Sequence, residues 1–544
     1  MTTELRARWL GLVPYAEAEM LQRAVHAHAR DDYLLLQEHP HVYTLGSSAD
    51  LAHVLRDPAS VGAELISADR GGDVTYHGPG QLVGYPIVSL AEWKAGQRDV
   101  VAYVRRLEEV LIAVCADFGI AAGRSPGFTG VWVAQEKRET TAQRPEGSGA
   151  WSRPKKIAAI GVRVSRGRTR HGFALNVDPD LTMFEHIVPC GIRDRGVTSL
   201  ARVLGRSVPM REVVDRVVAR FAETFGAATV DRADVAWSRP ERPDGDDAGI
   251  AVSLTRKRPD WMRIRAHFDD GYLELKRLAR EQQLHTVCEE AGCPNIYECW
   301  ADRTATFMIL GDRCTRACGF CLVDTRKPLA VDEDEPRRVA DAVATLDLAH
   351  AVITCVARDD LPDGGASVFA QTVAAIRATT PGTSVELLIS DCKGDPDALA
   401  TIFAARPEVL NHNLETVARL QRLVRPSAGY ARSLAVLARA KDSGLVTKSG
   451  IMLGLGETLG EVHAALADLR AVGVDLLTVG QYLRPSPAHV PVAKWWHPDE
   501  FAAVGDYARE LGFGHVESGP LVRSSYHARE GAARMEPWLT ASAP

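Results

Sequence analysis

The sequence predicts an α/β protein of two domains, and three observations support this. The chain has 544 residues, more than the ~250–300 residues at which a single hydrophobic core stops growing. A stretch rich in Pro, Gly and Asp, WSRPERPDGDDAG, separates two regions of regular apolar patterning. The apolar patterns on its two sides also differ, because strand and helix patterns are mixed before it and alternate after it. We therefore expect one domain at 1–236, a linker at 237–255 and a second domain at 256–544.

The first region mixes strand and helix patterns. Short β-branched runs that are typical of strands occur in LVGYPIVSL, GVWVAQ and KIAAIGVRVS. Longer stretches with helical periodicity are VAYVRRLEEVLIAVCADFG and MREVVDRVVARFAETFG. An α+β domain is therefore expected. Between Val133 and Lys156 lies a polar insert that is long for a hairpin loop.

The second region alternates strands with helices. Its apolar runs are ATFMILG, AHAVITCVA, SVELLIS, VLNHNLE, LVTKSGIMLG and LLTVGQYLRP, with helical patterns between most of them. This alternation predicts a parallel sheet that curves into a barrel or partial barrel. In such a barrel the chemistry lies at the carboxyl ends of the strands.

Composition excludes several classes of protein. Hydrophobic residues make up 46% and charged residues 25% of the chain, as in ordinary globular proteins. The 64 basic and 70 acidic residues give a net charge of −6, which disfavours nucleic acid as a partner. The first 20 residues lack the regions of a secretory signal, and no apolar run approaches the ~18 residues of a membrane span. We expect a cytoplasmic protein without a membrane partner.

Six of the ten cysteines lie between Cys288 and Cys321. Disulfides are rare in the cytosol, so this clustering indicates metal ligation. Cys314, Cys318 and Cys321 form a C-x3-C-x2-C loop directly after the apolar run TFMIL. Three thiolates on one loop can hold three irons of a [4Fe–4S] cube and leave the fourth iron for another ligand. Zinc would prefer paired C-x2-C sequences and a fourth ligand.

A second triplet, Cys288, Cys293 and Cys299, has the different spacing C-x4-C-x5-C and indicates a second cluster. With HTVCEEAGCPNIYECW, RDDLPDGG, HNLETV and GPLVRSSYHA, residues 256–529 resemble lipoyl synthases of the radical S-adenosylmethionine (SAM) family. The resemblance implies a partial (β/α)6 TIM-type barrel, two [4Fe–4S] clusters, SAM and an electron donor. It also implies sulfur insertion at C6 and C8 of an octanoyl chain, whose unactivated C–H bonds no side-chain base can deprotonate.

The same resemblance implies roles for individual residues. Cys314, Cys318 and Cys321 hold the cluster that cleaves SAM, and the first triplet with Ser525 holds the auxiliary cluster that donates sulfur. Without the resemblance, the preferred interpretation of Ser525 would be a hydroxyl that caps a nearby backbone group. The loop after AVITCVA offers SAM-binding groups or forms only a turn; its candidates are Asp359, Asp360, Gly364 and Gly365. Cys355 and Cys392, where the family usually has a serine and an aromatic residue, are predicted to be small buried hydrophobic residues.

Glycine-rich motifs also mark the first domain. They are RGGDVTYHGPGQ from Arg70, KIAAIG from Lys156, HGFALN from His171 and PCGI from Pro189. In this order they resemble lipoyl (octanoyl) transferases over about residues 31–225. The resemblance implies the fold of biotin and lipoate protein ligase catalytic domains. It also implies transfer of octanoate from octanoyl-acyl carrier protein to a lysine of lipoyl domains, in 2-oxoacid dehydrogenase complexes and the glycine cleavage H protein.

In this resemblance Cys190 is the nucleophile, which forms an octanoyl thioester. Lys156, and not its neighbour Lys155, is the cation that stabilises the thiolate. A lone cysteine is more often a small buried residue, and His77 could be a proton carrier or a core histidine. The residues expected to bind substrate are Arg70, Gly71, Gly72, Asp73, Val74, Thr75, Tyr76, His77, Ala159, Ile160, Gly161, Gly172, Phe173 and Ala174.

The two resemblances together predict a fusion of octanoyltransferase and lipoyl synthase. One alternative makes the first half an ATP-dependent lipoate or biotin ligase, since those families share its fold. ATP dependence and indifference to loss of Cys190 would reveal it. Another is a non-catalytic iron–sulfur or zinc scaffold that binds acyl carrier protein, which would form no 5′-deoxyadenosine.

Overall fold

The structure is a computed structural model. It describes residues 4–90, 92–94, 97–134, 154–191, 195–238, 258–262, 277, 285–286, 295–296, 299 and 303–541. Most of the insert between Val133 and Lys156 and most of the predicted linker at 237–255 lie outside these residues. Internal contacts divide the chain into two compact units, Met1–Trp237 and Ser238–Pro544.

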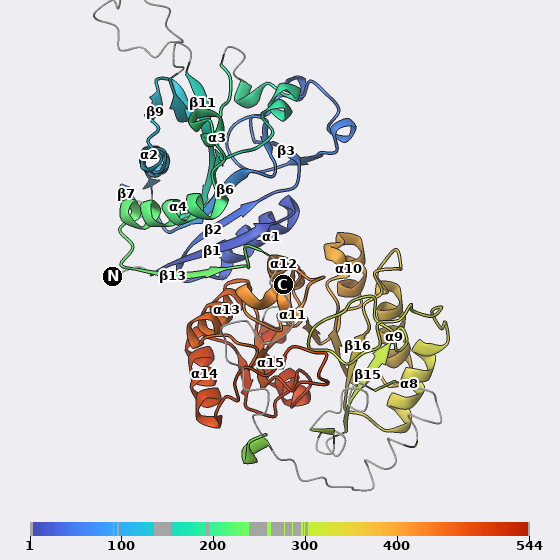
Figure 1. Ribbon diagram of the computed structural model, residues 1–544. Coiled ribbons are helices and arrows are strands. Elements are labelled where there is room, and N and C mark those ends of the chain that lie inside the picture. The colour runs from blue at the N-terminus through green and yellow to red at the C-terminus, as the bar shows by residue number, and fades with distance from the viewer. Residues whose placement is uncertain are drawn as a thin grey trace, which may run out of the picture. The chain divides into compact units, whose positions relative to one another are not determined.

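The first unit is built on a mixed eight-stranded sheet (Figure 1). β1 pairs in parallel with β13 and β2, whereas the remaining neighbours are antiparallel. In spatial order the strands are β13 (Thr229–Asp234), β1 (Glu4–Leu12), β2 (Asp32–Glu38), β6 (Gln81–Ile87), β12 (Arg168–Asn176), β11 (Lys155–Ser165), β10 (Phe128–Val133) and β9 (Ala122–Ser125).

Amphipathic helices cover this sheet. α4 (Met210–Phe225) buries residues spaced three and four apart, Val214, Val217, Val218 and Phe221, and packs against α2 (Val100–Asp117). α2 begins where the Asp99 side chain accepts a hydrogen bond from the Ala102 N–H. α1 (Tyr15–His28) lies against β6 and β12. The short α3 (Leu200–Leu204) follows the 3-10 helices η3 (Leu181–His186) and η4 (Pro189–Gly191).

A smaller sheet lies beside the main one and carries the glycine-rich segment. It consists of β4 (Glu64–Ser67), β3 (Val42–Leu45) and β5 (Thr75–His77), in that order. The 3-10 helices η1 (Leu51–His53) and η2 (Pro58–Val61) lie between β3 and β4 in the chain. β7 (Glu92–Lys94) and β8 (Gln97–Arg98) form a separate hairpin.

The second unit contains seven adjacent parallel strands, with β14 (His285–Thr286) antiparallel at one edge. The parallel strands are β15 (Thr304–Ile309), β16 (His350–Cys355), β17 (Ser384–Leu388), β18 (Val409–Asn411), β19 (Thr447–Leu453), β20 (Leu476–Gln481) and β21 (His515–Ser518). β15–β20 correspond to the six predicted strands. β21 was not predicted, because the sequence HVES has little apolar patterning.

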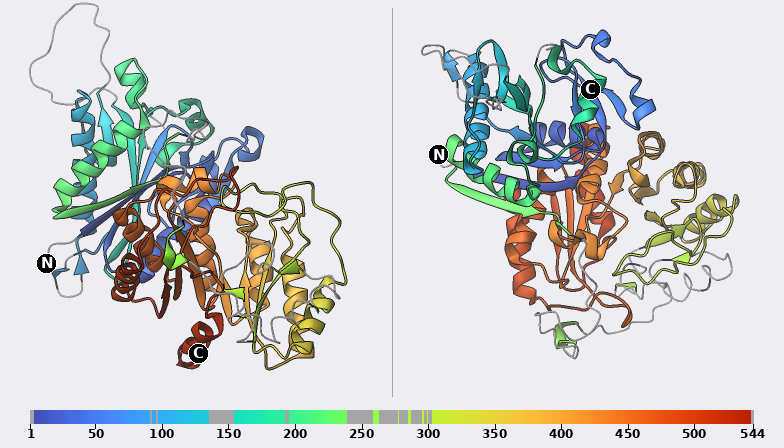
Figure 2. Two further views of the ribbon diagram at one scale, coloured as in Figure 1. Left: turned by 60° about the horizontal axis from the view of Figure 1, so that its bottom comes forward. Right: turned by 45° about the horizontal axis from the view of Figure 1, so that its top comes forward.

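Helices connect the parallel strands in turn (Figures 1 and 2). They are α8 (Glu335–Thr345), α9 (Ala366–Thr379), α10 (Pro396–Ala404), α11 (Gln421–Val424), α12 (Tyr430–Asp442), α13 (Leu459–Ala471) and α14 (Pro498–Leu511), and α15 (Ala528–Ala541) follows β21. A capping box of Thr458 and Glu461 starts α13, and Gly512 in the left-handed conformation ends α14. The predicted α/β architecture is therefore confirmed in both units.

The strands of the second unit are buried along most of their length, as expected for a parallel sheet covered by helices. All six residues of β15 and of β20 are buried. Ile353, Phe369, Leu387 and Ile402 belong to one hydrophobic cluster between strands and helices. Among the described helices, none combines the length and the apolar character needed to cross a membrane.

Candidate functional site

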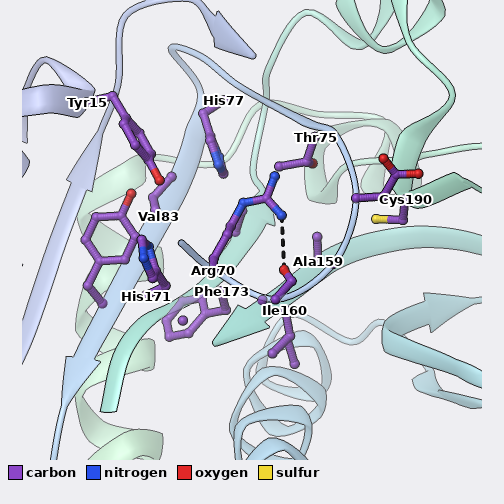
Figure 3. Close-up of a pocket in the computed structure, with 17 residues that line it drawn as sticks. Tyr15, Arg70, Thr75, His77, Val83, Ala159, Ile160, His171, Phe173 and Cys190 are labelled. Carbon is purple, nitrogen blue, oxygen red and sulfur yellow. Dashed lines mark hydrogen bonds between the residues drawn. The ribbon is translucent and has the colours of Figure 1, made fainter. Parts of the chain in front are cut away.

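The first unit contains a pocket at which segments from distant parts of the sequence meet (Figure 3). Twelve of the fourteen residues predicted to bind substrate line it, together with Cys190. The pocket is lined by Tyr15, Arg70, Gly71, Gly72, Asp73, Thr75, His77, Val83, Tyr85, Ala159, Ile160, Gly161, His171, Gly172, Phe173, Ala174 and Cys190.

Val74 and Tyr76 are placed differently from the prediction. Both are completely buried in a small cluster with Tyr43, Met183 and Phe184, on the other side of β5. Successive side chains of a strand point to opposite faces. Thr75 and His77 therefore face the pocket, whereas Val74 and Tyr76 support it from behind.

Glycine permits the walls of the pocket to lie close together. A Cβ atom on Gly161 would lie 2.8 Å from the carbonyl oxygen of Gly71. The Gly71 N–H also donates to the Val162 carbonyl, at 3.1 Å. The loop at 70–72 can thus run directly against β11 because position 161 has no side chain.

Arg70 places a positive charge inside this pocket. Its guanidinium donates to the carbonyl and hydroxyl oxygens of Thr44, at 2.6 and 2.8 Å from Nη2, and to the Gly71 carbonyl. Burial lowers the pKa of Arg70, and the nearby Tyr15 and Cys190 oppose that effect. In Figure 3, Arg70 lies between Cys190 on one side and Tyr15 and His171 on the other.

The end of the pocket away from Cys190 carries rings and polar atoms. The Nδ1–H of His77 donates a hydrogen bond to Oε1 of Gln81, at 2.7 Å, and burial holds the pKa of His77 well below the ordinary value. His77 is therefore a neutral, buried histidine. Burial also lowers the pKa of His171, whose Nε2 lies 2.7 Å from Asp69 Oδ1. Sequence reasoning missed the lining residues Tyr15, Val83, Tyr85 and His171, of which only His171 lies within a recognised motif.

Cys190 lies on a short turn that presents its sulfur to the pocket (Figure 3). The residue has φ 55° and ψ 24°, a left-handed conformation that non-glycine residues rarely adopt. Its N–H donates to the Val74 carbonyl at 3.0 Å, and the Gly191 N–H donates to the Val188 carbonyl at 3.1 Å. The surrounding hydrogen bonds thus hold a strained backbone, as is common at functional sites.

Lys156 is buried on β11, with its backbone bonded to Gly196 and Thr198. Its ammonium lies 4.9 Å from the centroid of the Trp132 ring, a cation–π contact. Within the described part of the chain, Lys156 is not among the residues that line the pocket. The predicted pairing with Cys190 therefore stays a prediction.

In the second unit, Cys314, Cys318 and Cys321 follow β15 on one loop. Backbone hydrogen bonds tie this loop to its surroundings: Cys314 N–H to the Asp324 carbonyl at 2.8 Å, and Gly319 N–H to the Val424 carbonyl at 2.8 Å. The Ala357 N–H also lies 3.3 Å from Cys314 Sγ. The loop therefore sits beside the carboxyl end of β16, where a β/α barrel places its chemistry.

The surroundings of these thiols fit an iron–sulfur cluster. Burial, with a smaller contribution from the sulfurs of Cys314 and Cys321, raises the pKa of Cys318 to about 12. Burial also raises the pKa of Cys321. Three thiolates at this place require a positive partner to offset their desolvation and mutual repulsion, and iron ions supply it. The donor set thus fits three irons of a [4Fe–4S] cluster.

Of the first triplet, Cys288 and Cys293 lie outside the described residues. Cys299 is half-buried, and its N–H donates to the Asn295 carbonyl at 3.0 Å. The Asn295 side chain donates to the Leu521 carbonyl at 2.7 Å. Leu521 lies four residues before the half-buried Ser525. This hydrogen bond joins the Cys299 segment to the segment that carries Ser525, as a shared cluster would require.

The carboxylates of the RDDLPDGG loop are engaged by arginines. Both oxygens of Asp359 accept hydrogen bonds from Arg316 at 2.8 Å, and those of Asp360 accept from Arg358 at 2.9 Å. The hydrogen bonds from Arg316 lower the pKa of Asp359. Because Arg316 stands between Cys314 and Cys318, this ion pair anchors the cysteine loop.

The rest of that loop starts a helix. Gly364 and Gly365 have left-handed φ values of 61° and 91°, and Asp363 accepts from the Gly365 and Ser367 N–H groups at the start of α9. The role of Asp359, Asp360, Gly364 and Gly365 in binding SAM stays a prediction. Cys392 belongs to the hydrophobic cluster, and Cys355 packs against it.

Comparison with known proteins agrees with the division into two units. The family model "Lipoyl protein ligase A/B catalytic domain" matches residues 12–222, and the model "Radical SAM superfamily" matches residues 308–469. The chain is 59% identical over 278 residues to the lipoyl synthase of Mycolicibacterium paratuberculosis, covering 51% of this chain and 91% of that protein. It is 58% identical over 282 residues to the lipoyl synthase of Beutenbergia cavernae, covering 52% and 85%.

Proposed function

Because the chain belongs to the lipoyl synthase family, we propose that it catalyses two consecutive steps of lipoate biosynthesis. The first unit transfers octanoate from octanoyl-acyl carrier protein to a lysine of a lipoyl domain. The second unit then inserts sulfur at C6 and C8 of that octanoyl group. The observation that carries the proposal is the Cys190 thiol in the wall of the pocket, within a lipoyl ligase A/B catalytic domain fused to a lipoyl synthase.

In the first step Cys190 attacks the octanoyl thioester of the carrier protein. The pocket offers the apolar side chains of Val83, Ile160 and Phe173 to the acyl chain, and Arg70 offers positive charge to the reacting carbonyl. The exchange of one thioester for another needs no energy source. Transfer to an amine then forms the more stable amide, so that ATP is not required.

In the second step two groups of cysteines act separately. Cys314, Cys318 and Cys321 would hold one [4Fe–4S] cluster, and Cys288, Cys293, Cys299 and Ser525 would hold the auxiliary one. When bound, the first cluster would supply, with SAM and an electron donor, the radical chemistry for C–H cleavage, and the second would supply the sulfur atoms. Arg316 holds the loop at 314–321 in place through ion pairs with Asp359 and Asp391, at 2.8 and 2.6 Å.

The intermediate defines the partners. Octanoate is attached to a protein lysine between the two steps, so a lipoyl domain must visit both units. We include the lipoyl domains of 2-oxoacid dehydrogenase complexes and the glycine cleavage H protein in this class of substrate. An ATP-dependent ligase has less support, because such an enzyme needs no thiol where Cys190 lies.

One experiment tests both steps. The full chain, reconstituted anaerobically, is incubated with octanoyl-acyl carrier protein, a lipoyl domain, SAM and reductant, without ATP. Mass spectrometry of the domain should show octanoylation followed by a gain of two sulfur atoms. Iron and sulfide analysis should give about eight of each per chain, as two [4Fe–4S] clusters require. If octanoylation appears only when ATP is added, the first unit is a ligase and not a transferase.

A further inference from the structure

Two buried polar atoms at the far end of the pocket lack hydrogen-bond partners among the described residues. They are the hydroxyl oxygen of Tyr15, on α1, and Nδ1 of His171, on β12. The two residues are only 2% and 1% exposed, and Figure 3 shows both at the end of the pocket away from Cys190. Buried polar groups in native proteins almost always have a partner. A ligand or an ordered water molecule is therefore the expected partner of these two atoms.

Hydrogen bonds from two sides hold His171 in its orientation. Its backbone has a left-handed φ of 55°, which non-glycine residues rarely adopt. The His171 N–H donates to Oε1 of Gln22 at 2.7 Å, and Nε2 of the ring lies 2.7 Å from Oδ1 of Asp69. Burial lowers the pKa of His171, so the ring is neutral. With its Nε2–H donated to the carboxylate, the imidazole keeps the lone pair of Nδ1 for a further donor.

The two tyrosines at this end of the pocket differ in their hydrogen bonds. The hydroxyl oxygen of Tyr85 lies 2.8 Å from Nε2 of His39 and is therefore already engaged. The ring of Tyr15 stacks on that of His77, with centroids 6.1 Å apart, and its hydroxyl has no such partner in the described part of the chain. A hydroxyl group or a water molecule can accept from Tyr15 and donate to His171 at the same time, whereas a methyl group can do neither.

The length of the pocket matches an eight-carbon chain. Ala159, which lies toward Cys190 in Figure 3, pairs with Ala174 on β12, three residues after His171. At ~3.4 Å per strand residue, this separation is about 10 Å. An extended octanoyl group, with C–C bonds of about 1.5 Å, spans roughly 9 Å. The terminal carbon of an octanoyl thioester on Cys190 is therefore expected beside Tyr15 and His171.

We propose that Tyr15 and His171 form a polar end wall of the acyl pocket, which binds a hydroxyl group or a water molecule beyond the eighth carbon; this inference rests on the proposed function of the first unit. With octanoate in the pocket, the bound group is water. A longer apolar chain displaces that water and leaves two buried polar atoms without a partner, which is unfavourable. The two residues thus determine specificity by excluding apolar chains of more than eight carbons.

Two acyl groups of equal length test this end wall. Nonanoyl and 8-hydroxyoctanoyl both extend the octanoyl chain by one heavy atom, and only the second can form hydrogen bonds there. Both are loaded on acyl carrier protein and offered as a mixture to the full chain, and mass spectrometry of the intact enzyme measures each thioester on Cys190. The wild type should prefer 8-hydroxyoctanoyl by about tenfold or more, because a site built to bind a hydroxyl rejects an analogue that lacks it.

A pair of matched variants assigns the preference to the end wall. Tyr15→Phe removes the hydroxyl and keeps the ring, so it should lower the preference by at least about threefold. Because the preference is a ratio within one enzyme sample, partial unfolding of a variant does not change it. Tyr103→Phe is the control: the Tyr103 hydroxyl on α2 is also buried without a hydrogen-bond partner among the described residues, but Tyr103 does not line the pocket. The control should keep the wild-type preference.

The outcomes also distinguish this inference from the function on which it rests. If octanoyl-acyl carrier protein forms no thioester on Cys190 of the wild type, the proposed transferase is wrong and the inference fails with it. If the octanoyl thioester forms but nonanoyl is accepted as readily as 8-hydroxyoctanoyl, only the polar end wall is overturned. A preference that is unchanged in Tyr15→Phe overturns the assignment of Tyr15 to that wall.

Discussion

Cys190 and the cysteines of the 314–321 loop are all half-buried thiols on short loops, yet their surroundings differ. Cys190 is a single sulfur in a pocket that also contains the guanidinium of Arg70 and the carboxylate of Asp73. In the 314–321 loop, burial and neighbouring sulfurs raise the pKa of Cys318 to about 12. One thiol among polar groups can act as a nucleophile, whereas a buried group of three needs metal ions.

The two sites are also held in different ways. The Cys190 turn depends on backbone hydrogen bonds around a left-handed residue. The 314–321 loop depends in addition on an ion pair, because Arg316 bridges Asp359 and the fully buried Asp391 side chain. A nucleophile must be reached by its substrate, whereas cluster ligands must keep a fixed spacing while iron is bound.

The largest expected effect is the loss of SAM cleavage when the 314–321 loop loses its thiols. Replacing Cys314, Cys318 and Cys321 by alanine should abolish 5′-deoxyadenosine formation and remove about four irons per chain. Octanoyl transfer should be unchanged, since the first unit has its own core. Chromatographic assay of 5′-deoxyadenosine with iron analysis checks this, and cleavage at the wild-type rate would contradict the assignment.

Replacing Cys190 should have the opposite effect: it should stop octanoyl transfer and leave SAM cleavage intact. Cys190→Ala should lower octanoyl transfer by at least about 1000-fold, because the nucleophile is absent. SAM cleavage and iron content should match the wild type. Mass spectrometry of a lipoyl domain measures the transfer. Cys115→Ala, at a buried cysteine on α2, is the control and should retain transfer; a fully active Cys190→Ala enzyme would exclude a thioester.

Within the second unit, the two cysteine triplets should differ from each other. Replacing Cys288, Cys293 and Cys299 by alanine should leave part of the SAM cleavage but stop sulfur insertion, because the sulfur donor is lost. Assaying 5′-deoxyadenosine and lipoylated product in the same reaction tests this. Lipoylated product from that variant would show that the sulfur has another source.

A smaller effect is expected at the ion pair that anchors the 314–321 loop. Arg316 lowers the pKa of Asp359 in the folded protein. The ion pair therefore stabilises the fold fully at pH values above the ordinary aspartate pKa of about 3.9. This stabilisation is lost as the pH falls through the lower pKa that Asp359 has in the folded state. Asp359→Asn should therefore reduce the free energy of unfolding by about 1–2 kcal/mol at pH 7, with a smaller difference at pH 3.

Denaturant unfolding at the two pH values measures this difference. Amide exchange across residues 314–321 should also become faster in Asp359→Asn. Asp506→Asn is the control, since Asp506 forms a surface ion pair with Arg509 and its side chain is 70% exposed. An equal loss in both variants would show that Asp359 is only another surface charge.

The smallest effect concerns the covalent link between the units. Separately expressed segments 1–236 and 250–544 should each keep their own activity, because the contacts fall into two compact units. Coupled conversion of octanoyl-acyl carrier protein to lipoylated domain should fall behind that of the full chain only at high dilution. A dilution series with product mass spectrometry tests this, and equal rates at every dilution would exclude a tethering advantage.

The sequence by itself determined the features that depend on local spacing. The six strands β15–β20 were predicted because apolar runs and helical patterns alternate over short distances. The thiols of Cys314, Cys318 and Cys321 lie on one loop because their separation is built into eight consecutive residues. In the first unit, the glycines at 71, 161 and 172 marked three segments that do meet at one pocket.

Only the tertiary structure decided which side chains meet across long separations. Tyr15 and Tyr85 reach the pocket from α1 and β6, and nothing in their neighbouring sequence indicates this. Val74 and Tyr76 face away from it because β5 alternates its side chains. His53 and Asp73 meet although 20 residues separate them, since this contact depends on how η1 packs against the Cys190 turn. Local spacing in the sequence determines the periodicity of strands and helices and whether neighbouring cysteines can hold a metal. Packing determines which distant side chains come together.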